Sequence, residues 1–402
     1  MKKWFLHILL LAGLFGTLTT SCSQEDEGFE KVLSGKKEEK VTVFFTLALD
    51  ETSARSRATW GDNLDNVDTN NYESAIGDNF DNYINPDQFF VKLNIGNVSY
   101  EVSDLVYWQT GTNVYEFVGE VEVEANPTVN PQTAKVMVYA NMNPNQEAFT
   151  VNYDQENGFP NTGVEYIPMW GVQTIQNLSL APGVRNDLGT IYLLRSMAKV
   201  EVIMANSEFE ISAINIRGYN NMGKCLPNGW NDEKTMTTTG LDLEGVFNPM
   251  PTYVDDQKPA FKESITEDGF KCYTVYVPEY RNIAPDNQTS VTPSIISVTI
   301  GDKEYKIEFK NYANGAATNV AYNIVRNHIY RFNITGVNSA VETGLNLEYM
   351  VMRWNRVVNK DLTFGNPYGN AMDGEEAPDT DPQDPSEGET DNTQNGSGNV
   401  TQ

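Results

Sequence analysis

The chain has 402 residues, of which 40% are hydrophobic and 11% aromatic, so it can bury sizeable cores. Its 55 acidic and 28 basic residues give a formal net charge of −27. A field of that sign would repel nucleic acid and anionic lipid surfaces, so neither is expected as a partner.

The first 22 residues have the pattern of a bacterial lipoprotein signal peptide. A basic start, Met1-Lys-Lys3, precedes an apolar run over residues 4–16 that is too short to span a membrane. The run leads to Cys22, which would be the acylated residue, and an acidic segment follows it. The position three before the cysteine holds Thr19 in place of a branched apolar residue, so ordinary signal-peptide cleavage is the alternative. The leader predicts an outer-membrane lipoprotein precursor.

Residues 23–57 read as a propeptide that contains a first strand and ends at a protease site. The run 41–49 places five alternate apolar side chains on one face, as a strand that caps a hydrophobic groove would. These side chains are Val41, Val43, Phe45, Leu47 and Leu49. The segment 53–58 consists of small residues and two arginines, which is typical of an exposed site for a trypsin-like protease. Cleavage between Arg57 and Ala58, with Arg55 as the second choice, would release the strand.

The body of the chain alternates strand-like runs with turn-forming residues and shows no long window with the apolar period of a helix. Examples of these runs are Phe89–Ile95, Val114–Val123, Lys135–Tyr139, Ile191–Ile203 and Ile329–Val337. Short strands at this spacing predict an all-β chain of the sandwich type.

Composition also predicts how the chain is divided. About 345 residues follow Arg57, which is more than one core usually organises. A stretch rich in Gly, Asn, Pro and Gln suggests a boundary near residue 185, between domains over 58–185 and 186–364. Residues 366–402 hold nine Asp or Glu and no Lys or Arg, so 365–402 is expected to be a disordered acidic tail.

Four short motifs follow one another along the body of the chain. They are Ile167-Pro-Met-Trp-Gly171, Leu194-Arg-Ser-Met-Ala-Lys-Val-Glu-Val202, Tyr276-Val-Pro-Glu279 and Arg326-Asn-His-Ile-Tyr330. In this order, behind a lipoprotein leader and an Arg-Ala processing site, they resemble the fimbrillin family, including its Mfa-like branch, the subunits of type V pili.

The resemblance implies two tandem transthyretin-like β-sandwich domains and a role in building a surface fimbria. It implies that an arginine-specific, trypsin-like protease removes the first strand from a lipidated precursor. A C-terminal strand of a neighbouring subunit would then fill the groove. The expected partners are other fimbrial subunits, the maturation protease, and a host or microbial surface ligand. No cofactor is expected.

The candidate donor strand lies in residues 345–354. Three apolar side chains would face one way and three the other, namely Leu347, Tyr349 and Val351 against Met350, Met352 and Trp354. Burying about five such side chains would contribute on the order of 7–15 kcal/mol before association costs. The alternative is that the segment is an internal strand of its own domain. The 38 residues after Phe364 leave a stalk subunit and an accessory tip or anchor subunit both open.

Residue chemistry gives little sign of an enzyme, so the chain is expected not to be one. His328 is the one histidine after the leader and is interpreted as structural, and the usual nucleophile, zinc and phosphate motifs are absent from the sequence. Paired carboxylates leave no local signature, so a hydrolase that uses them is the alternative. Cys225 and Cys272 could form a disulfide or stay as buried thiols.

Two further features suggest ligands. The sequence Gly-Asp-Asn-Leu-Asp-Asn at 61–66 recurs as Gly-Asp-Asn-Phe-Asp-Asn at 77–82. Such oxygen-rich loops can hold Ca²⁺, against the alternative of a polar surface loop. The weak calcium candidates are Asp62, Asp65, Asp78 and Asp81. Exposed tryptophans would instead suit a glycan-binding surface lipoprotein, and those considered are Trp60, Trp108, Trp170 and Trp230.

Overall fold

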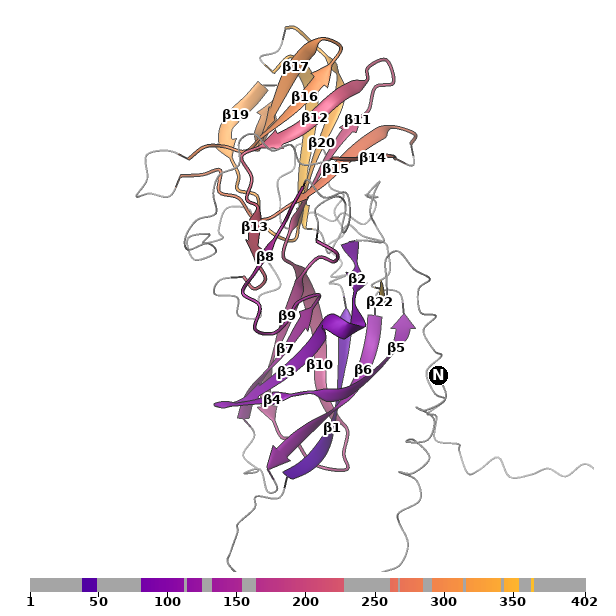
Figure 1. The fold of residues 1–402 in the computed structure, drawn as a ribbon, viewed down its shortest axis with the longest axis vertical. Helices are drawn as coiled ribbons and strands as arrows, with labels where there is room; N and C mark the ends of the chain where they lie inside the picture. Colours follow the sequence, from indigo (N-terminus) through magenta and orange to yellow (C-terminus); the bar gives the residue numbers. More distant parts are fainter. Residues whose placement is uncertain are drawn as a thin grey trace, which may run out of the picture. The chain divides into compact units, whose positions relative to one another are not determined.

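The chain is almost entirely β-structure in a computed structural model, which confirms the all-β prediction (Figure 1). The structure describes residues 38–48, 81–111, 114–124, 132–153, 164–227, 261–266, 268–284, 291–313, 316–340, 343–353 and 363–364. Within these ranges the named elements are strands and one short 3-10 helix, η1 (Pro86–Gln88). No helix in them is long and apolar enough to cross a membrane.

An eight-stranded sheet contains most of the strands from the first half of the chain. Its order is β4-β3-β7-β9-β10-β1-β6-β5. The strands are β1 (Glu38–Ala48), β3 (Phe89–Ile95), β4 (Val98–Glu101), β5 (Ser103–Gly111), β6 (Val114–Glu124), β7 (Gln132–Ala140), β9 (Met169–Leu178) and β10 (Asn186–Arg195).

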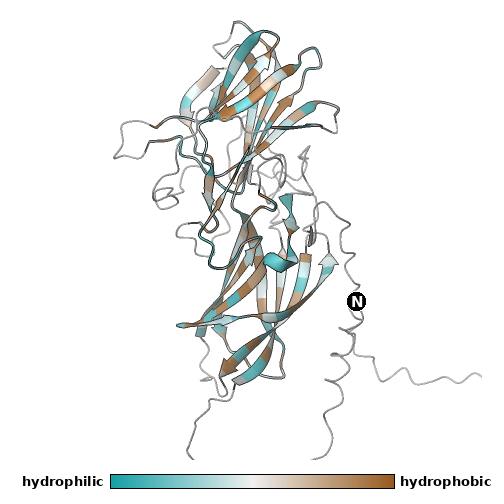
Figure 2. Cartoon of the chain, in the orientation of Figure 1, coloured by the Kyte–Doolittle hydropathy of each residue, from teal (hydrophilic) through white to brown (hydrophobic). Residues whose placement is uncertain are grey.

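This sheet curls on itself. Phe89 of β3 and Phe117 of β6 belong to strands near opposite ends of the sheet order, yet their rings stack with centroids 5.1 Å apart. Val102, which connects β4 to β5, donates its backbone N–H to the carbonyl of Val91 in β3 at 3.0 Å. The apolar faces of the strands therefore enclose one core, and Figure 2 shows the alternation of hydrophobic and hydrophilic residues along them.

Two smaller sheets hold the later strands. A five-stranded sheet has the order β14-β15-β11-β20-β21, and a three-stranded sheet has the order β12-β16-β17. Phe309, which follows β17, packs edge-to-face on Tyr330 and Phe332 of β20, so the two sheets share a core. The strands are β11 (Ala198–Met204), β12 (Ile211–Arg217), β14 (Lys262–Ile265), β15 (Lys271–Val277), β16 (Ile295–Ile300), β17 (Lys303–Glu308), β20 (His328–Val337) and β21 (Leu345–Arg353).

Three short strand pairs complete the described elements. They are β8 (Ala148–Thr150) with β13 (Met222–Lys224), β18 (Lys310–Ala313) with β19 (Ala316–Ala321), and β2 (Tyr83–Ile84) with β22 (Thr363–Phe364). The chain passes from the eight-stranded sheet to the five-stranded sheet between Arg195, the last residue of β10, and Ala198, the first residue of β11. β10 therefore belongs to the first sheet. The division into domains at residue 185 stays a prediction.

The four sequence motifs meet where β10 passes into β11. Ser196 donates its N–H to the carbonyl of Pro168 at 2.9 Å, and Asn327 donates its N–H to that of Met197 at 2.8 Å. The side chains of Arg326 and Glu279 form a buried two-point ion pair, at 2.9 and 2.8 Å. The four motifs are therefore far apart in the sequence but contact one another at one buried polar junction, where their polar groups are hydrogen-bonded.

Candidate functional site

β1 lies inside the eight-stranded sheet, between β6 and β10 (Figure 1). It pairs antiparallel with β6 along its whole length, from Glu38 opposite Glu124 to Ala48 opposite Val114. On its other side it pairs in parallel with β10, with a shift of register between Phe44 and Thr46. A strand in this position has both edges hydrogen-bonded, so its loss would leave two open edges.

The inner face of β1 supplies core side chains at every second position. Val41, Val43 and Leu47 are 0% exposed and Phe45 is 1% exposed. The Phe45 ring stacks on Phe117 of β6, with centroids 4.8 Å apart and planes at 5°. Full burial of an aliphatic or aromatic side chain contributes about 1.5–3 kcal/mol, so the four together contribute on the order of 6–12 kcal/mol.

The outer face of β1 is more exposed than the inner face. Thr42 is exposed and Phe44 is half-buried beneath the guanidinium of Arg185, at 4.2 Å from the ring centroid. Lys40 pairs with Glu120 at 2.7 Å on the surface, where ion pairs contribute little. The strand is therefore held by its backbone ladders and its apolar inner face.

Asn186 at the start of β10 also holds β1, and sequence reasoning did not single it out. Its amide nitrogen donates to the carbonyl of Thr42 in β1 at 2.9 Å and to those of Ala181 and Val184 at 3.0 Å. Its amide oxygen accepts the N–H of Ala181 at 3.0 Å. One side chain thus closes the preceding turn and contacts the β1 backbone, and the Gly-Val-Arg-Asn turn sequence was the available signal.

The candidate donor segment forms β21, an edge strand of the five-stranded sheet. It pairs with β20, from His328 opposite Arg353 to Val337 opposite Leu345. Leu347, Tyr349, Met350 and Val351 are all buried there. In this structure β21 is part of its own sheet, and Met352 lies in it without a described side chain.

Several predicted site residues fall outside the described residues. They are Cys22, Leu49, Arg55, Arg57, Ala58, Asp62, Asp65, Asp78 and Trp354. Asp81 is described, and it is fully buried against Lys199, with 2.8 Å between Oδ2 and Nζ. Asp81 therefore does not lie at the surface, and its ion pair with Lys199 offsets part of the cost of burying its charge.

Solved structures similar to this chain include Mfa-type fimbrial proteins. The C-terminally truncated tip fimbrial protein Mfa3 from Porphyromonas gingivalis is 12% identical, with a TM-score of 0.43 over 79% of this chain and 100% of that one. A fimbrial assembly protein from Parabacteroides distasonis is 13% identical, with a TM-score of 0.39 over 78% and 96%. The fimbrial anchor protein Mfa2 from Porphyromonas gingivalis is 8% identical, with a TM-score of 0.29 over 78% and 97%.

No protein-family model and no curated protein matches the sequence. At these identities and TM-scores a structural likeness does not assign a function.

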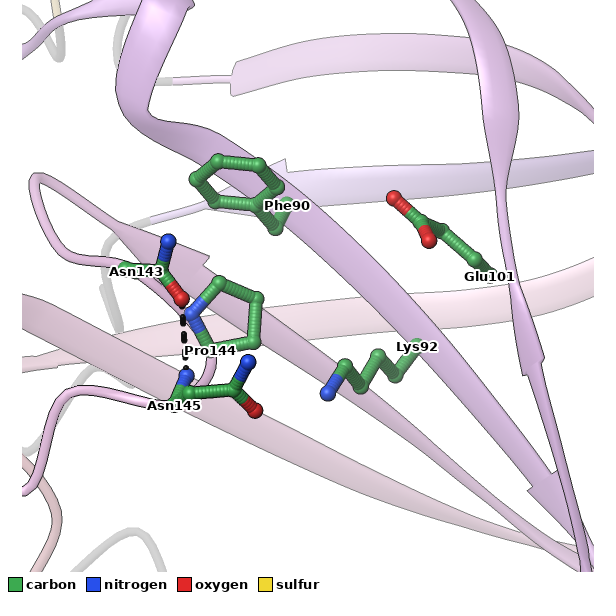
Figure 3. A pocket seen from close by; sticks show the side chains of 6 residues that line it. All are labelled: Phe90, Lys92, Glu101, Asn143, Pro144 and Asn145. Carbon is green, nitrogen blue, oxygen red and sulfur yellow. Dashed lines mark hydrogen bonds between the residues drawn. The ribbon is translucent and has the colours of Figure 1, made fainter.

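The described residues show little of a small-molecule site. The pocket in Figure 3 is lined by Phe90, Lys92, Glu101, Asn143, Pro144 and Asn145. Within it, the backbone N–H of Asn145 donates to Oδ1 of Asn143 at 2.9 Å. No group of three His, Cys, Asp or Glu side chains in the described part of the chain could hold a metal ion.

The predicted histidine and the two predicted cysteines are interior, and the four tryptophans differ in burial. His328 is buried, and its Nδ1 lies 2.8 Å from the carbonyl oxygen of Arg326. Cys225 and Cys272 are free, buried thiols. Of the tryptophans, Trp170 is buried and Trp108 is half-buried, while Trp60 and Trp230 lie outside the described ranges.

Proposed function

We propose that the chain is a structural subunit of a cell-surface fimbria, exported as a lipoprotein precursor acylated at Cys22 and assembled by strand exchange. A trypsin-like, arginine-specific protease cleaves after Arg57, and a strand from another subunit takes the place of β1. The observation that carries the proposal is the position of β1. It is a central, buried strand whose last residue, Ala48, lies nine positions before Arg57.

Cleavage would change how β1 is held. In the precursor β1 is joined to the rest of the sheet by the chain, so the groove stays filled and the subunit cannot pair. After the cut β1 is a separate peptide that can dissociate. Its loss would leave β6 and β10 with unpaired backbone groups on either side of an apolar groove, which is a strong template for another strand.

The incoming strand must match the pattern that β1 leaves. It needs apolar side chains at alternate positions to replace Val41, Val43, Phe45 and Leu47. The stretch Leu345–Val351 has this pattern. If it donates, β21 must first leave β20, so exchange would open the edge of its own sheet. A donor segment that begins after Arg353 would avoid this cost.

The test uses the precursor without residues 1–22, digested under native conditions with a trypsin-like protease. We expect a new N-terminus at Ala58 and loss of the fragment that carries β1. We also expect a ladder of subunit oligomers when the digest is separated by size. A variant with Arg55→Ala and Arg57→Ala should stay intact and monomeric. A chain that resists cutting at both arginines would overturn the proposal.

Two truncations locate the donor. A copy that ends at Gly344 lacks β21, and a copy that ends at Arg353 keeps it. Ladders from the longer copy alone would assign donation to β21, and loss of ladders from both would assign it to the chain beyond Arg353. Clean cutting of the full chain without ladders would instead indicate a tip or anchor subunit.

A further inference from the structure

A cluster of charged side chains lies buried on one face of β11. Lys199 and Glu201 are two residues apart on this strand, so they share a face, and both are 0% exposed. Lys199 lies opposite Tyr276 of β15, and Glu201 lies opposite Arg331 of β20. The strand register therefore fixes an amine, a carboxylate and a phenol within one small region.

Asp81 completes the cluster from a distant part of the sequence. Its Oδ2 lies 2.8 Å from Nζ of Lys199, and its Oδ1 accepts a hydrogen bond of 2.6 Å from the Tyr276 hydroxyl. Its backbone carbonyl accepts from Nε of Arg195 at 2.6 Å. Asp81 is itself 0% exposed, so the carboxyl carbon is held beside the amine away from water.

Glu201 is placed to move a proton. Its Oε1 lies 3.3 Å from Nζ of Lys199, and its Oε2 accepts from Nε of Arg331 at 2.5 Å. The guanidinium orients the carboxylate toward the amine. Such an arrangement of nucleophile, oriented base and hydrogen-bonded acyl group has the components of an acyl transfer.

A dry environment favours the reactive forms of both partners. Burial raises the pKa of the Asp81 carboxyl above its usual range, against the opposing effect of Lys199. An ammonium and a carboxylate that are both desolvated can pass one proton between them to give a neutral amine and a neutral acid. Only the neutral amine is a nucleophile, and only the acid loses its hydroxyl readily as water.

We propose that Lys199 and Asp81 become joined by an intramolecular amide bond, with Glu201 as the proton relay. Nζ of Lys199 attacks Cγ of Asp81, and the Tyr276 hydroxyl stabilises the charge that develops on Oδ1. Glu201 takes a proton from the nitrogen and delivers it to Oδ2, which leaves as water. The C–N bond forms, the C–O bond breaks, and the products are the amide and one water molecule, so no other reactant is required.

The bond would close a covalent loop across 118 sequence positions. The loop contains every strand of the eight-stranded sheet except β1. A tensile force applied to the chain before Asp81 would pass through the amide bond to β11, and it would bypass the eight-stranded sheet. The inference does not depend on strand exchange, because it concerns a bond within one chain.

Intact-mass spectrometry of the chain without residues 1–22 tests the proposal. We expect a mass lower than the sequence mass by one water molecule. Tryptic digestion should yield one branched product that joins the peptide containing Asp81 to the one containing Lys199, with no cleavage at Lys199. A folded chain of full sequence mass would overturn the proposal and leave an ion pair. A water loss confined to the Asp81 peptide would overturn it as well, because that is cyclisation of the aspartate itself.

Variants separate the chemistry from the fold. Lys199→Met removes the nucleophile, and Glu201→Gln keeps the shape of the relay but not its basicity. Both should have the full sequence mass, with circular dichroism and a urea transition verifying that each is folded. A folded Glu201→Gln chain that still lacks one water molecule would overturn the role of Glu201. The mass of the wild-type chain shows whether the amide bond has formed, even if a variant does not fold.

Discussion

Replacing a residue of a buried ion pair should reduce the stability of this fold more than most other single replacements. Arg326 and Glu279 are both about 1% exposed, and the guanidinium also donates to the carbonyl of Cys225 at 3.0 Å. Removing one partner of such a pair leaves an uncompensated charge in the interior. Single removals of this kind typically cost about 3–5 kcal/mol.

Glu279→Gln should therefore lower the free energy of unfolding by about 3 kcal/mol or more. The matched control is Glu210→Gln, which breaks the surface pair with Lys271 and should change the free energy by less than about 1 kcal/mol. Urea unfolding followed by circular dichroism measures both. Equal effects of the two variants would contradict the structural role assigned to the junction.

The buried thiols predict a stability that falls at alkaline pH. Burial raises the pKa of Cys225 and of Cys272 from 9.0 to about 12. Above pH 9 the unfolded chain releases these protons while the folded chain keeps them, so the unfolded state gains stability as pH rises. The urea midpoint should drop between pH 9 and pH 12, and less so in a Cys225→Ala, Cys272→Ala chain. Both thiols should also resist alkylation at pH 8 until the chain is unfolded.

At the scale of elements, β1 should stabilise the precursor but not the mature subunit. Phe45→Ala removes a fully buried ring and should lower precursor stability by about 3–5 kcal/mol. Thr42→Ala, on the exposed side of the same strand, is the control and should have little effect. After cleavage and removal of β1, chains made from either variant should unfold at the same urea concentration. A difference that persists would mean that β1 had not left.

Asn186 offers a second test of how β1 is held. Asn186→Ala removes the hydrogen bond to Thr42 and the closure of the preceding turn, while the apolar groove stays intact. A labelled peptide of residues 38–49 should bind to the cleaved subunit from which β1 has been removed. When Asn186 is replaced, this binding should be several-fold weaker, since a hydrogen bond contributes about 0.5–1.5 kcal/mol. Unchanged binding, measured by fluorescence anisotropy, would show that the apolar face alone decides affinity.

Local periodicity predicted much at this scale. Alternation of apolar residues identified the run 41–49, and Val41, Val43, Phe45 and Leu47 do lie on one buried face. What periodicity cannot give is the partner of a strand. The parallel pairing of β1 with β10 joins residues more than 140 positions apart and depends on the whole core. The burial of Asp81 escaped prediction for the same reason, since its partners lie in β11 and β15.

Charge acts on the molecule as a whole. The net charge of −27 includes nine acidic residues in 366–402, so the rest of the chain carries −27 + 9 = −18. Two copies of such a chain repel each other before any strand can be exchanged. The range of that repulsion is about 30 Å at 0.01 M salt and about 8 Å at 0.15 M.

Assembly of the cleaved subunit should therefore accelerate with ionic strength. We expect the initial rate of ladder formation to rise on the order of tenfold between 0.01 and 0.15 M salt, as for other associations dominated by net charge. Removal of residues 366–402 should raise the rate at low salt and reduce its salt dependence, because that copy carries a third less charge. Loss of ladders on the same removal would give the tail a direct part in exchange. Light scattering against salt concentration, with uncleaved precursor as the control, distinguishes the two effects.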